Sequence, residues 1–267
     1  MNRLRRFLAP ALLFLACLPQ GSAQTLQLKD GKVLLAREIR REGNFLFLKV
    51  ATPSGEVGDE LVQIPQLERI DFGEQPVLVE ARQLAQSGDA AGVLEKTSQP
   101  ADYFRTYADL PGSPWPDVMR LRLPALAVAG SAEKLAELQK SWTPTGDPEL
   151  DTAFRLIAAG QNDPNGARTA RKALAQPGAG TLAAGISWLE IGQAALDAKQ
   201  WRNAARAFLS VEVFVPQQRL LMPKALLGAA KAFKEKGDLG KAANFVQELR
   251  TDFPGTAETA AAEELLK

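Results

Sequence analysis

A pattern of six residues occurs twice near the C-terminus, with the same order and the same spacing in both copies. The first set consists of Trp188, Gly192, Ala195, Ala204, Phe208 and Pro216, and the second consists of Leu226, Ala230, Phe233, Ala242, Val246 and Pro254. The offset that carries Trp188 onto Leu226 is the length of one helix–turn–helix unit. Such units stack, because one pair of helices cannot bury its own apolar face. The sequence therefore predicts a stacked helical array, an architecture that usually binds other proteins.

The residue types in this pattern have physical roles. Small residues such as Gly192 and Ala204 allow the two helices of a pair to approach closely, while Phe208 fills the space between neighbouring pairs. Pro216 and Pro254 end the second helix of each pair, because proline cannot continue a helix. An ordinary α-helical bundle stays open as the alternative.

These positions resemble tetratricopeptide repeats over residues 181–267. The dipeptide Gly237-Asp238 matches the usual turn of that family, whereas Lys199-Gln200 does not, and the offset from Trp188 to Leu226 is longer than the period of the family. The segment Asp252–Ala257 is typical of tetratricopeptide proteins of the bacterial envelope, which carry a signal peptide and serve as assembly or coordination factors. The resemblance implies a non-catalytic protein-binding scaffold with a helical solenoid.

The resemblance also implies where a partner would bind. Ligands of such repeats lie in the concave groove lined by the first helix of each pair, which gives Gln193, Lys231 and Lys234 as candidates, with Lys224 near one edge. The three lysines favour an acidic or carboxylate-ended peptide. The alternative is that these four side chains are only solvated.

The first 23 residues have the pattern of a secretory signal peptide. Three arginines precede an apolar run, Phe7–Leu18, that is too short for an ordinary membrane span. Gly21-Ser22-Ala23 supplies small residues for cleavage before Gln24. We therefore expect an exported protein of a bacterial envelope, either periplasmic or secreted, with an association with the outer membrane left open.

Cys17 is the single cysteine of the chain and lies in this leader. Phe14-Leu15-Ala16-Cys17 loosely resembles a lipobox, in which the cysteine would carry a lipid, but leucine is usual where Phe14 stands. Loss of Cys17 with the leader is the simpler interpretation, and membrane contact is expected only if Cys17 is lipidated. Either outcome leaves the mature chain without a disulfide.

The charge balance argues against a nucleic-acid partner. The chain has 32 basic and 31 acidic residues, and removal of the three leader arginines leaves 29 basic residues. A nearly neutral surface gives no field that attracts polyanions. Proteins or peptides are therefore the expected partners, with no nucleic acid.

Residues 24–75 are predicted to form a small β-barrel. Short alternating strands are separated by turn signals such as Asp30-Gly31 and Gly43-Asn44, with a single 3₁₀ turn near Pro65 before the last strand. Closure would remove exposed edges, and the pattern resembles the SH3-like and Sm-like small barrels. The strand Phe45–Val50 is apolar on both faces, so its second face should pack on the helical region or on a partner.

The remaining chain is predicted to be helical. Residues 76–177 read as helical hairpins and residues 178–267 as the two repeats with a closing helix. A proline-rich loop containing Pro100, Pro111, Pro114 and Pro116 is expected to interrupt the first region. The expected fold is thus multidomain, with a small N-terminal β-barrel followed by an α-helical solenoid.

The residues needed for common catalytic chemistry are missing or explained otherwise. The chain has no histidine, which removes histidine-based triads and zinc sites. Ser131-Ala132-Glu133-Lys134 lacks the partner motifs of penicillin-binding enzymes, so Ser131 is expected to be a helix cap. The carboxylates of Asp147–Asp151 fit a helix N-terminus better than a metal or acid–base site. We expect no enzyme activity, no metal and no cofactor.

Trp115 supports the main alternative to a scaffold. It stands in the unusual loop Pro111–Pro116, where it is expected to cover the helical core. If Trp115 were instead exposed, it could serve with the barrel face in a carbohydrate- or peptidoglycan-binding module. A glycan hydrolase using two facing carboxylates is the third hypothesis.

Overall fold

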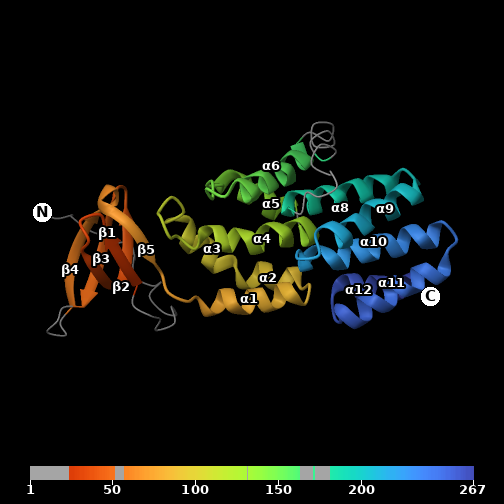
Figure 1. Cartoon of the computed structure of the whole chain (residues 1–267), viewed down its shortest axis with the longest axis horizontal. Coiled ribbons are helices and arrows are strands. Elements are labelled where there is room, and N and C mark those ends of the chain that lie inside the picture. Colours follow the sequence, from red (N-terminus) through yellow and green to blue (C-terminus); the bar gives the residue numbers. More distant parts are fainter. Residues whose placement is uncertain (1–23, 52–56, 131, 163–170, 172–180) are drawn as a thin grey trace, which may run out of the picture. The chain divides into compact units, whose positions relative to one another are not determined.

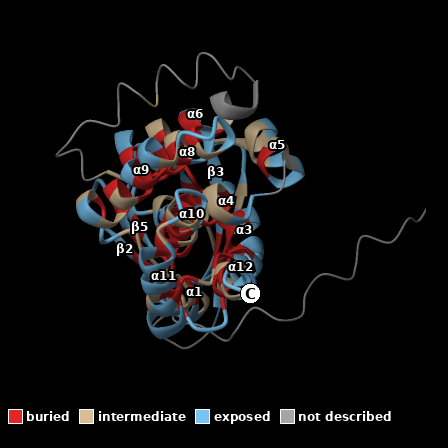
Figure 2. Ribbon diagram, turned by 90° about the vertical axis from the view of Figure 1, so that its right-hand side faces the viewer, coloured by how far each residue is buried: buried red, intermediate tan, exposed pale blue. Residues whose placement is uncertain are grey.

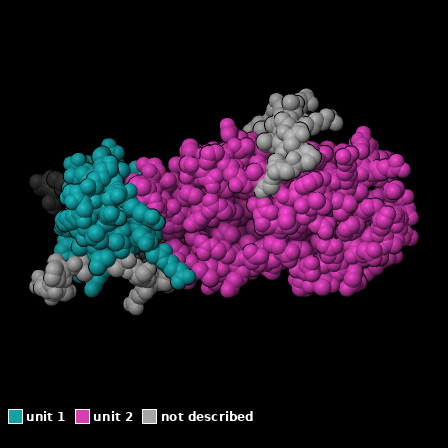
Figure 3. All heavy atoms as spheres, viewed as in Figure 1, with its two compact units in different colours: residues 1–74 teal, residues 75–267 magenta. Residues whose placement is uncertain are grey.

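The computed structural model describes residues 24–51, 57–130, 132–162, 171 and 181–267. The predicted leader, Cys17 and Ser131 lie outside these residues. The chain divides into a β unit that ends at Glu74 and a helical unit, Gln75–Lys267 (Figure 3). The sequence pattern places its boundary one residue later, between residues 75 and 76.

The β unit is an antiparallel sheet with the strand order β4-β3-β2-β1-β5 (Figure 1). Its strands are β1 (Gln24–Leu28), β2 (Val33–Glu42), β3 (Phe45–Ala51), β4 (Val57–Gln63) and β5 (Leu67–Asp71). A 3₁₀ turn, η1 (Ile64–Gln66), connects β4 to β5. The sheet is open, since no ladder joins β4 to β5 among the described residues. The ladders therefore do not confirm the closed barrel.

The turns of the β unit follow from local chemistry. Gly31 has a φ of 87° and Gly43 a φ of 56°, conformations that side chains with a Cβ rarely adopt. The carboxylate of Asp30 accepts a hydrogen bond from the backbone N–H of Lys32 at 2.9 Å. These contacts fix the register in which Leu26 of β1 faces Leu34 of β2. The inner face of the sheet is then lined by buried aliphatic side chains: Leu26, Leu34, Ile39, Leu46, Leu48, Val62 and Ile70.

The helical unit starts with six helices from α1 to α6. They are α1 (Pro76–Gln86), α2 (Ala90–Lys96), α3 (Ser98–Arg105), α4 (Trp115–Ala129), α5 (Ala132–Ser141) and α6 (Pro148–Asn162). Helix α3 is not predicted by the sequence pattern, which assigns Pro100 to a loop. Pro100 is the third residue of α3, where the first-turn N–H groups have no helical acceptor and a proline is tolerated.

Two helical hairpins and a last helix complete the unit. They consist of α8 (Leu182–Asp197), α9 (Trp201–Phe214), the 3₁₀ turn η2 (Arg219–Leu221), α10 (Met222–Glu235), α11 (Leu239–Asp252) and α12 (Ala257–Leu265). Successive helices pack on one another from α8 to α12, and α10 also contacts α8 and α12. The sequence pattern predicts these helices at residues 181–198, 201–213, 219–236, 239–251 and 256–267, which agrees with the structure to within three residues.

A continuous core joins the two helical regions that the sequence separated. Ala90, Val93 and Leu94 of α2 pack with Ala125 and Leu126 of α4 and with Leu220 of η2. Buried residues also lie between α8, α9 and α10 (Figure 2). The regions therefore form one compact unit, although the predicted boundary near residue 178 lies outside the described residues. Within the described part of the chain, no helix is long and apolar enough to cross a membrane.

Candidate partner-binding surfaces

The backbone of hairpin α8–α9 recurs in hairpin α10–α11. The residue before α9, Gln200, has φ −93° and ψ 65°, and its counterpart in the next hairpin, Asp238, has φ −92° and ψ 70°. The residue after α9, Val215, has φ −134° and ψ 47°, and the residue after α11, Phe253, has φ −136° and ψ 50°. The sequence period is thus a structural period, with both ends of the second helix repeated.

A single aromatic ring fills the space where the two hairpins meet. Phe208 of α9 is buried, and its ring lies so close to Gly192 of α8 and Gly228 of α10 that a Cβ there would be 2.7 Å and 2.5 Å from ring carbons. Close approach of three helices therefore depends on these glycines. The role predicted for Phe208 and Gly192 is confirmed.

A third hairpin uses the same turn chemistry. Gly88, with a φ of 78°, precedes Asp89, whose carboxylate accepts a hydrogen bond from the N–H of Gly92 at the start of α2. Gly237, with a φ of 87°, precedes Asp238, which caps α11 through the N–H of Lys241. The hairpin α1–α2 thus shares this turn, although the six-position pattern was recognised only in the C-terminal quarter.

Two of these lysines, Lys234 as a groove candidate and Lys224 near one edge of the predicted groove, donate hydrogen bonds to helix ends. Lys224 Nζ donates to the carbonyl of Ala127 at 3.0 Å, in the last turn of α4. Lys234 Nζ donates to the carbonyl of Leu265 at 2.6 Å, at the end of α12. The last carbonyls of a helix lack helical donors and carry partial negative charge, so both lysines stabilise neighbouring helices.

The other two groove candidates are exposed. Gln193 donates a hydrogen bond to Asp197 one turn later on α8, and Lys231 is exposed on α10. Among the described residues, no contact joins Gln193 or Lys231 to Lys224 or Lys234.

Trp115 is buried, with 1% of its surface exposed. Its indole Nε1 donates to the carbonyl of Thr143 at 3.0 Å, and its ring lies 6.4 Å from that of Trp142. Trp142 in turn stacks on Phe154 of α6 at 3.8 Å. The expectation that Trp115 covers the helical core is therefore confirmed. The alternative of an exposed Trp115, which the carbohydrate hypothesis requires, is wrong.

A largely apolar groove of about 390 Å³ runs beside α9 and the end of α10. We call it the α9–α10 groove, and it is lined by Arg202, Ala205, Arg206, Leu209, Ser210, Val213, Phe214, Phe233 and Lys236. Val213 is 67% exposed, an unusual value for a large aliphatic side chain in a helix. Phe233 stacks on Phe245 of α11 at 5.6 Å. The sequence pattern does not predict this groove. A signal for it is that Val213 and Phe214 widen the apolar face of the helix at residues 201–214.

The charges around this groove are separated along α9. Arg202 and Arg206 lie toward the start of the helix, whereas Glu212 lies about 15 Å farther along its axis than Arg202. Burial, followed by the charges of Glu212 and Asp252, raises the pKa of the Glu248 carboxyl on α11. The charged residues that line the groove are therefore the cations Arg202, Arg206 and Lys236, and these carboxylates lie outside its lining.

The outer face of the sheet exposes several apolar side chains. Phe45 is 38% exposed, and Phe47 pairs directly with the exposed Leu61 of β4. Arg40 places its guanidinium 5.1 Å from the centre of the Phe47 ring. The prediction that Phe45–Val50 is apolar on both faces is confirmed. Packing of the outer face on the helical unit stays a prediction.

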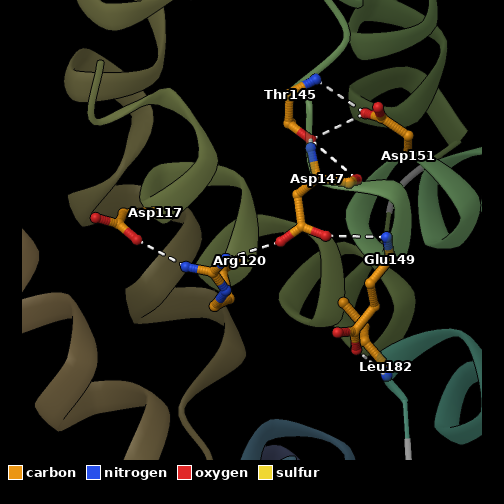
Figure 4. A network of polar contacts seen from close by, with 7 residues as sticks. All are labelled: Asp117, Arg120, Thr145, Asp147, Glu149, Asp151 and Leu182. Atoms are coloured by element: carbon orange, nitrogen blue, oxygen red, sulfur yellow. Dashed lines mark hydrogen bonds and ion pairs between the residues drawn. The ribbon is translucent and has the colours of Figure 1, made fainter. Parts of the chain in front are cut away.

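The carboxylates of Asp147–Asp151 form a structural network (Figure 4). Arg120 of α4 binds Asp117 at 2.7 Å and Asp147 at 2.9 Å. Partial burial opposes ionisation of Asp147, but hydrogen bonds from Arg120 and two backbone N–H groups outweigh it and lower its pKa. Asp151 accepts hydrogen bonds from the N–H and the hydroxyl of Thr145.

Glu149 extends this network to the next helix. Its carboxylate accepts a hydrogen bond from the N–H of Leu182, the first residue of α8, at 2.7 Å (Figure 4). Asp147 accepts from the N–H of Glu149 at the start of α6, Glu149 from the first N–H of α8, and Asp151 from Thr145, so all three carboxylates have structural partners. Within the described residues, no group of acidic, histidine or cysteine side chains could hold a metal ion.

Comparison of the chain with protein-family models, with curated proteins and with solved structures finds no match in any of the three.

Proposed function

We propose that this protein is a non-catalytic scaffold or assembly factor of the bacterial cell envelope that binds partner proteins through a tetratricopeptide-like helical solenoid. The observation that carries the proposal is the α9–α10 groove, which exposes Val213 on an apolar lining that also carries the cations Arg202, Arg206 and Lys236. Protein-binding surfaces of this kind commonly receive an amphipathic helix.

The recurrence of one hairpin geometry supports the solenoid part of this proposal. The same turn and the same helix ends return in the second hairpin, and the Gly-Asp turn also occurs between α1 and α2. Repeats that contact mainly their neighbours form extended binding surfaces. The predicted leader supplies the export step, and the return of β5 to β1 would suit a small SH3-like or Sm-like barrel.

The partner segment expected in the α9–α10 groove is an amphipathic helix with acidic residues at one end. Its apolar face would cover Val213, Leu209 and Phe233, and its acidic side chains would lie near Arg202 and Arg206. Like-charge repulsion with Glu212 and Glu248 would fix the direction of that helix, because charges set specificity more than affinity.

The test uses the full chain with a C-terminal affinity tag, expressed in the native host so that the predicted leader can direct export, and mass spectrometry of the co-purifying proteins. Val213→Lys places a charge in the groove and should remove the specific partners. Leu239→Lys is the matched control, because Leu239 is 60% exposed on α11 but does not line the groove. The proposal fails if no partner is retained by the wild-type chain. Retention of every partner by Val213→Lys would place the binding surface elsewhere.

The carbohydrate-binding alternative has lost its main support. It required an exposed Trp115, and this side chain is buried and hydrogen-bonded within the helical core.

A further inference from the structure

A second cleft in the helical unit lies among α2, α3, α4 and α5 and has a volume of about 490 Å³. Its lining consists of Ala91, Leu94, Glu95, Ser98, Ala101, Asp102, Arg105, Trp115, Arg122, Lys134, Glu137, Leu138 and Ser141. This volume lies in the range of small-molecule sites, about 300–1,000 Å³. The cleft, which we call the Arg122 cleft, does not share any residue with the α9–α10 groove.

Arg122 holds a charged guanidinium against the wall of this cleft with only neutral acceptors. Its Nη1 donates to the carbonyl of Leu94 at 3.2 Å and to the hydroxyl of Thr97 at 3.1 Å. Thr97 is itself buried and donates to the carbonyl of Val93 at 2.6 Å, so the guanidinium is held in place from below.

The charge of Arg122 is only partly compensated. Its buried Nε lacks a hydrogen-bond acceptor, and among the described residues no carboxylate forms an ion pair with it. Burial lowers the pKa of the guanidinium, while the charges of Asp102 and Glu137 act in the opposite direction from a longer distance. A half-buried charge with unused donors gains more from a carboxylate than an exposed charge would, because solvent screens it less.

Arginine is suited to carboxylates because its planar group presents parallel N–H donors to two oxygens. The lining of the cleft carries three acidic side chains, Glu95, Asp102 and Glu137, and two cations besides Arg122, which are Arg105 and Lys134. Opposite charges in equal number suit a ligand that carries both a carboxylate and an ammonium group. The apolar surface of Leu94 and Leu138 leaves room for a short aliphatic portion between the two charges.

We propose that the Arg122 cleft binds a zwitterionic ligand, an amino acid or short peptide, whose carboxylate pairs with Arg122 and whose ammonium group lies near Glu95, Asp102 and Glu137. The ligand's opposite charges match those of the cleft, and its size suits the volume. This site is independent of the scaffold function, since it uses neither the α9–α10 groove nor its helices.

Isothermal titration calorimetry of residues 24–267 with trialanine tests the proposal. Trialanine amide lacks the carboxylate and should bind at least about tenfold more weakly, because a charge-assisted hydrogen bond contributes about 1.5–3 kcal/mol. N-acetyl-trialanine lacks the ammonium group and should be weakened less. Free alanine, titrated separately, shows whether the amino acid or the peptide is the better ligand.

Variants assign the binding to Arg122. Arg122→Gln should weaken trialanine binding at least about tenfold, and Arg122→Lys, which keeps the charge but not the planar fork, should lie between this variant and the wild type. Arg82→Gln on the exposed surface of α1 is the control and should bind as the wild type does. The ¹⁵N resonance of Arg122 Nε should shift on addition of trialanine.

Three results would overturn the proposal. They are no binding of trialanine or alanine at up to about 10 mM, equal binding of trialanine and its amide, and unchanged binding by a folded Arg122→Gln variant. The peptide amide is compared on the wild-type chain, so the test holds even if Arg122→Gln does not fold.

Discussion

Hairpins α8–α9 and α10–α11 reverse direction through turns of the same backbone geometry, but only the second carries the residues that favour it. Gly237 takes the left-handed conformation in the second turn, whereas Lys199 takes it in the first with a φ of 57°. Asp238 caps α11 with its side chain, whereas Gln200 makes no such cap to α9. The second turn is encoded locally, and the first is held by the packing of its helices.

The two hairpins also differ in how strictly side-chain size is kept at equivalent positions. Ala204 and Ala242 are fully buried at equivalent positions, so a small side chain is kept there. Trp201 and Leu239 are both large, yet Leu239 is largely exposed. Positions between helices are therefore constrained by contact, and positions at the rim are not.

The largest expected effect distinguishes the two hairpin ends. Phe253→Ala should lower the free energy of unfolding by about 3–5 kcal/mol, whereas Val215→Ala, at the equivalent position, should cost about 1–3 kcal/mol. Phe253 is buried, contacts Gly88 and lies 4.3 Å below the Arg219 guanidinium, so it joins α1–α2 to the last helices. Urea unfolding measures both values, and equal losses would mean that the two ends are equivalent.

The next effect tests the contact between hairpins. Gly228→Ala should cost about 1–3 kcal/mol, because the added Cβ would meet the ring of Phe208 on three carbons and must displace it. Gly240→Ala is the matched control, since nothing lies within 4 Å of its Cβ position, and it should gain up to about 1 kcal/mol from helix propensity. Urea midpoints at constant m-value give the comparison. An unchanged free energy of unfolding in Gly228→Ala would show that Phe208 does not hold the two hairpins together.

Exchange of turn residues should change the two turns in opposite directions. Gly237→Ala should cost about 1–2 kcal/mol, because a side chain disfavours the left-handed conformation. Lys199→Gly should instead gain up to about 1 kcal/mol, since it relieves the same conformation in the first turn. Thermal unfolding followed by circular dichroism checks both variants. A loss of stability in Lys199→Gly would show that the lysine side chain has a role of its own.

The smallest effect concerns Glu248 on α11, which lies outside the lining of the α9–α10 groove. Burial and the neighbouring charges raise the pKa of Glu248 above its ordinary value of 4.5, so the folded state binds its proton more tightly than the unfolded state. The resulting destabilisation is absent well below 4.5 and complete above the raised pKa. Glu248→Gln should therefore stabilise the chain at pH 7 by a few tenths of a kcal/mol and lose this advantage as the pH falls. Urea unfolding across this range measures the difference, and a gain that persists at low pH would exclude electrostatics as its source.

Much of the fold follows from local signals. The turn residues Gly31 and Gly43 and the buried alternation of β3 predict the hairpins of the sheet, because both depend on neighbours along the chain. The repeated small residues predict the C-terminal hairpins for the same reason. Helix α3 was missed because a proline in a first turn cannot be distinguished from one in a loop by residue type alone.

The candidate sites depended on contacts between distant residues. Lys224 and Lys234 read as groove side chains, yet they cap helices α4 and α12, which lie 97 and 31 residues away along the chain. Arg122 has no distinguishing motif around it, and its importance comes from Leu94 and Thr97 beneath its guanidinium. No sequence period connects these residues.

The sequence by itself determined a β region followed by helical hairpins that repeat with one period, because turn chemistry and hydrophobic spacing act over a few residues. Only the tertiary structure decided that the helical regions share one core, that the sheet is open over the described strands, and that Trp115 is buried. It also placed the grooves and the charges that line them. Burial is a property of the surfaces that meet when segments far apart in the chain pack together, so local pattern cannot specify it.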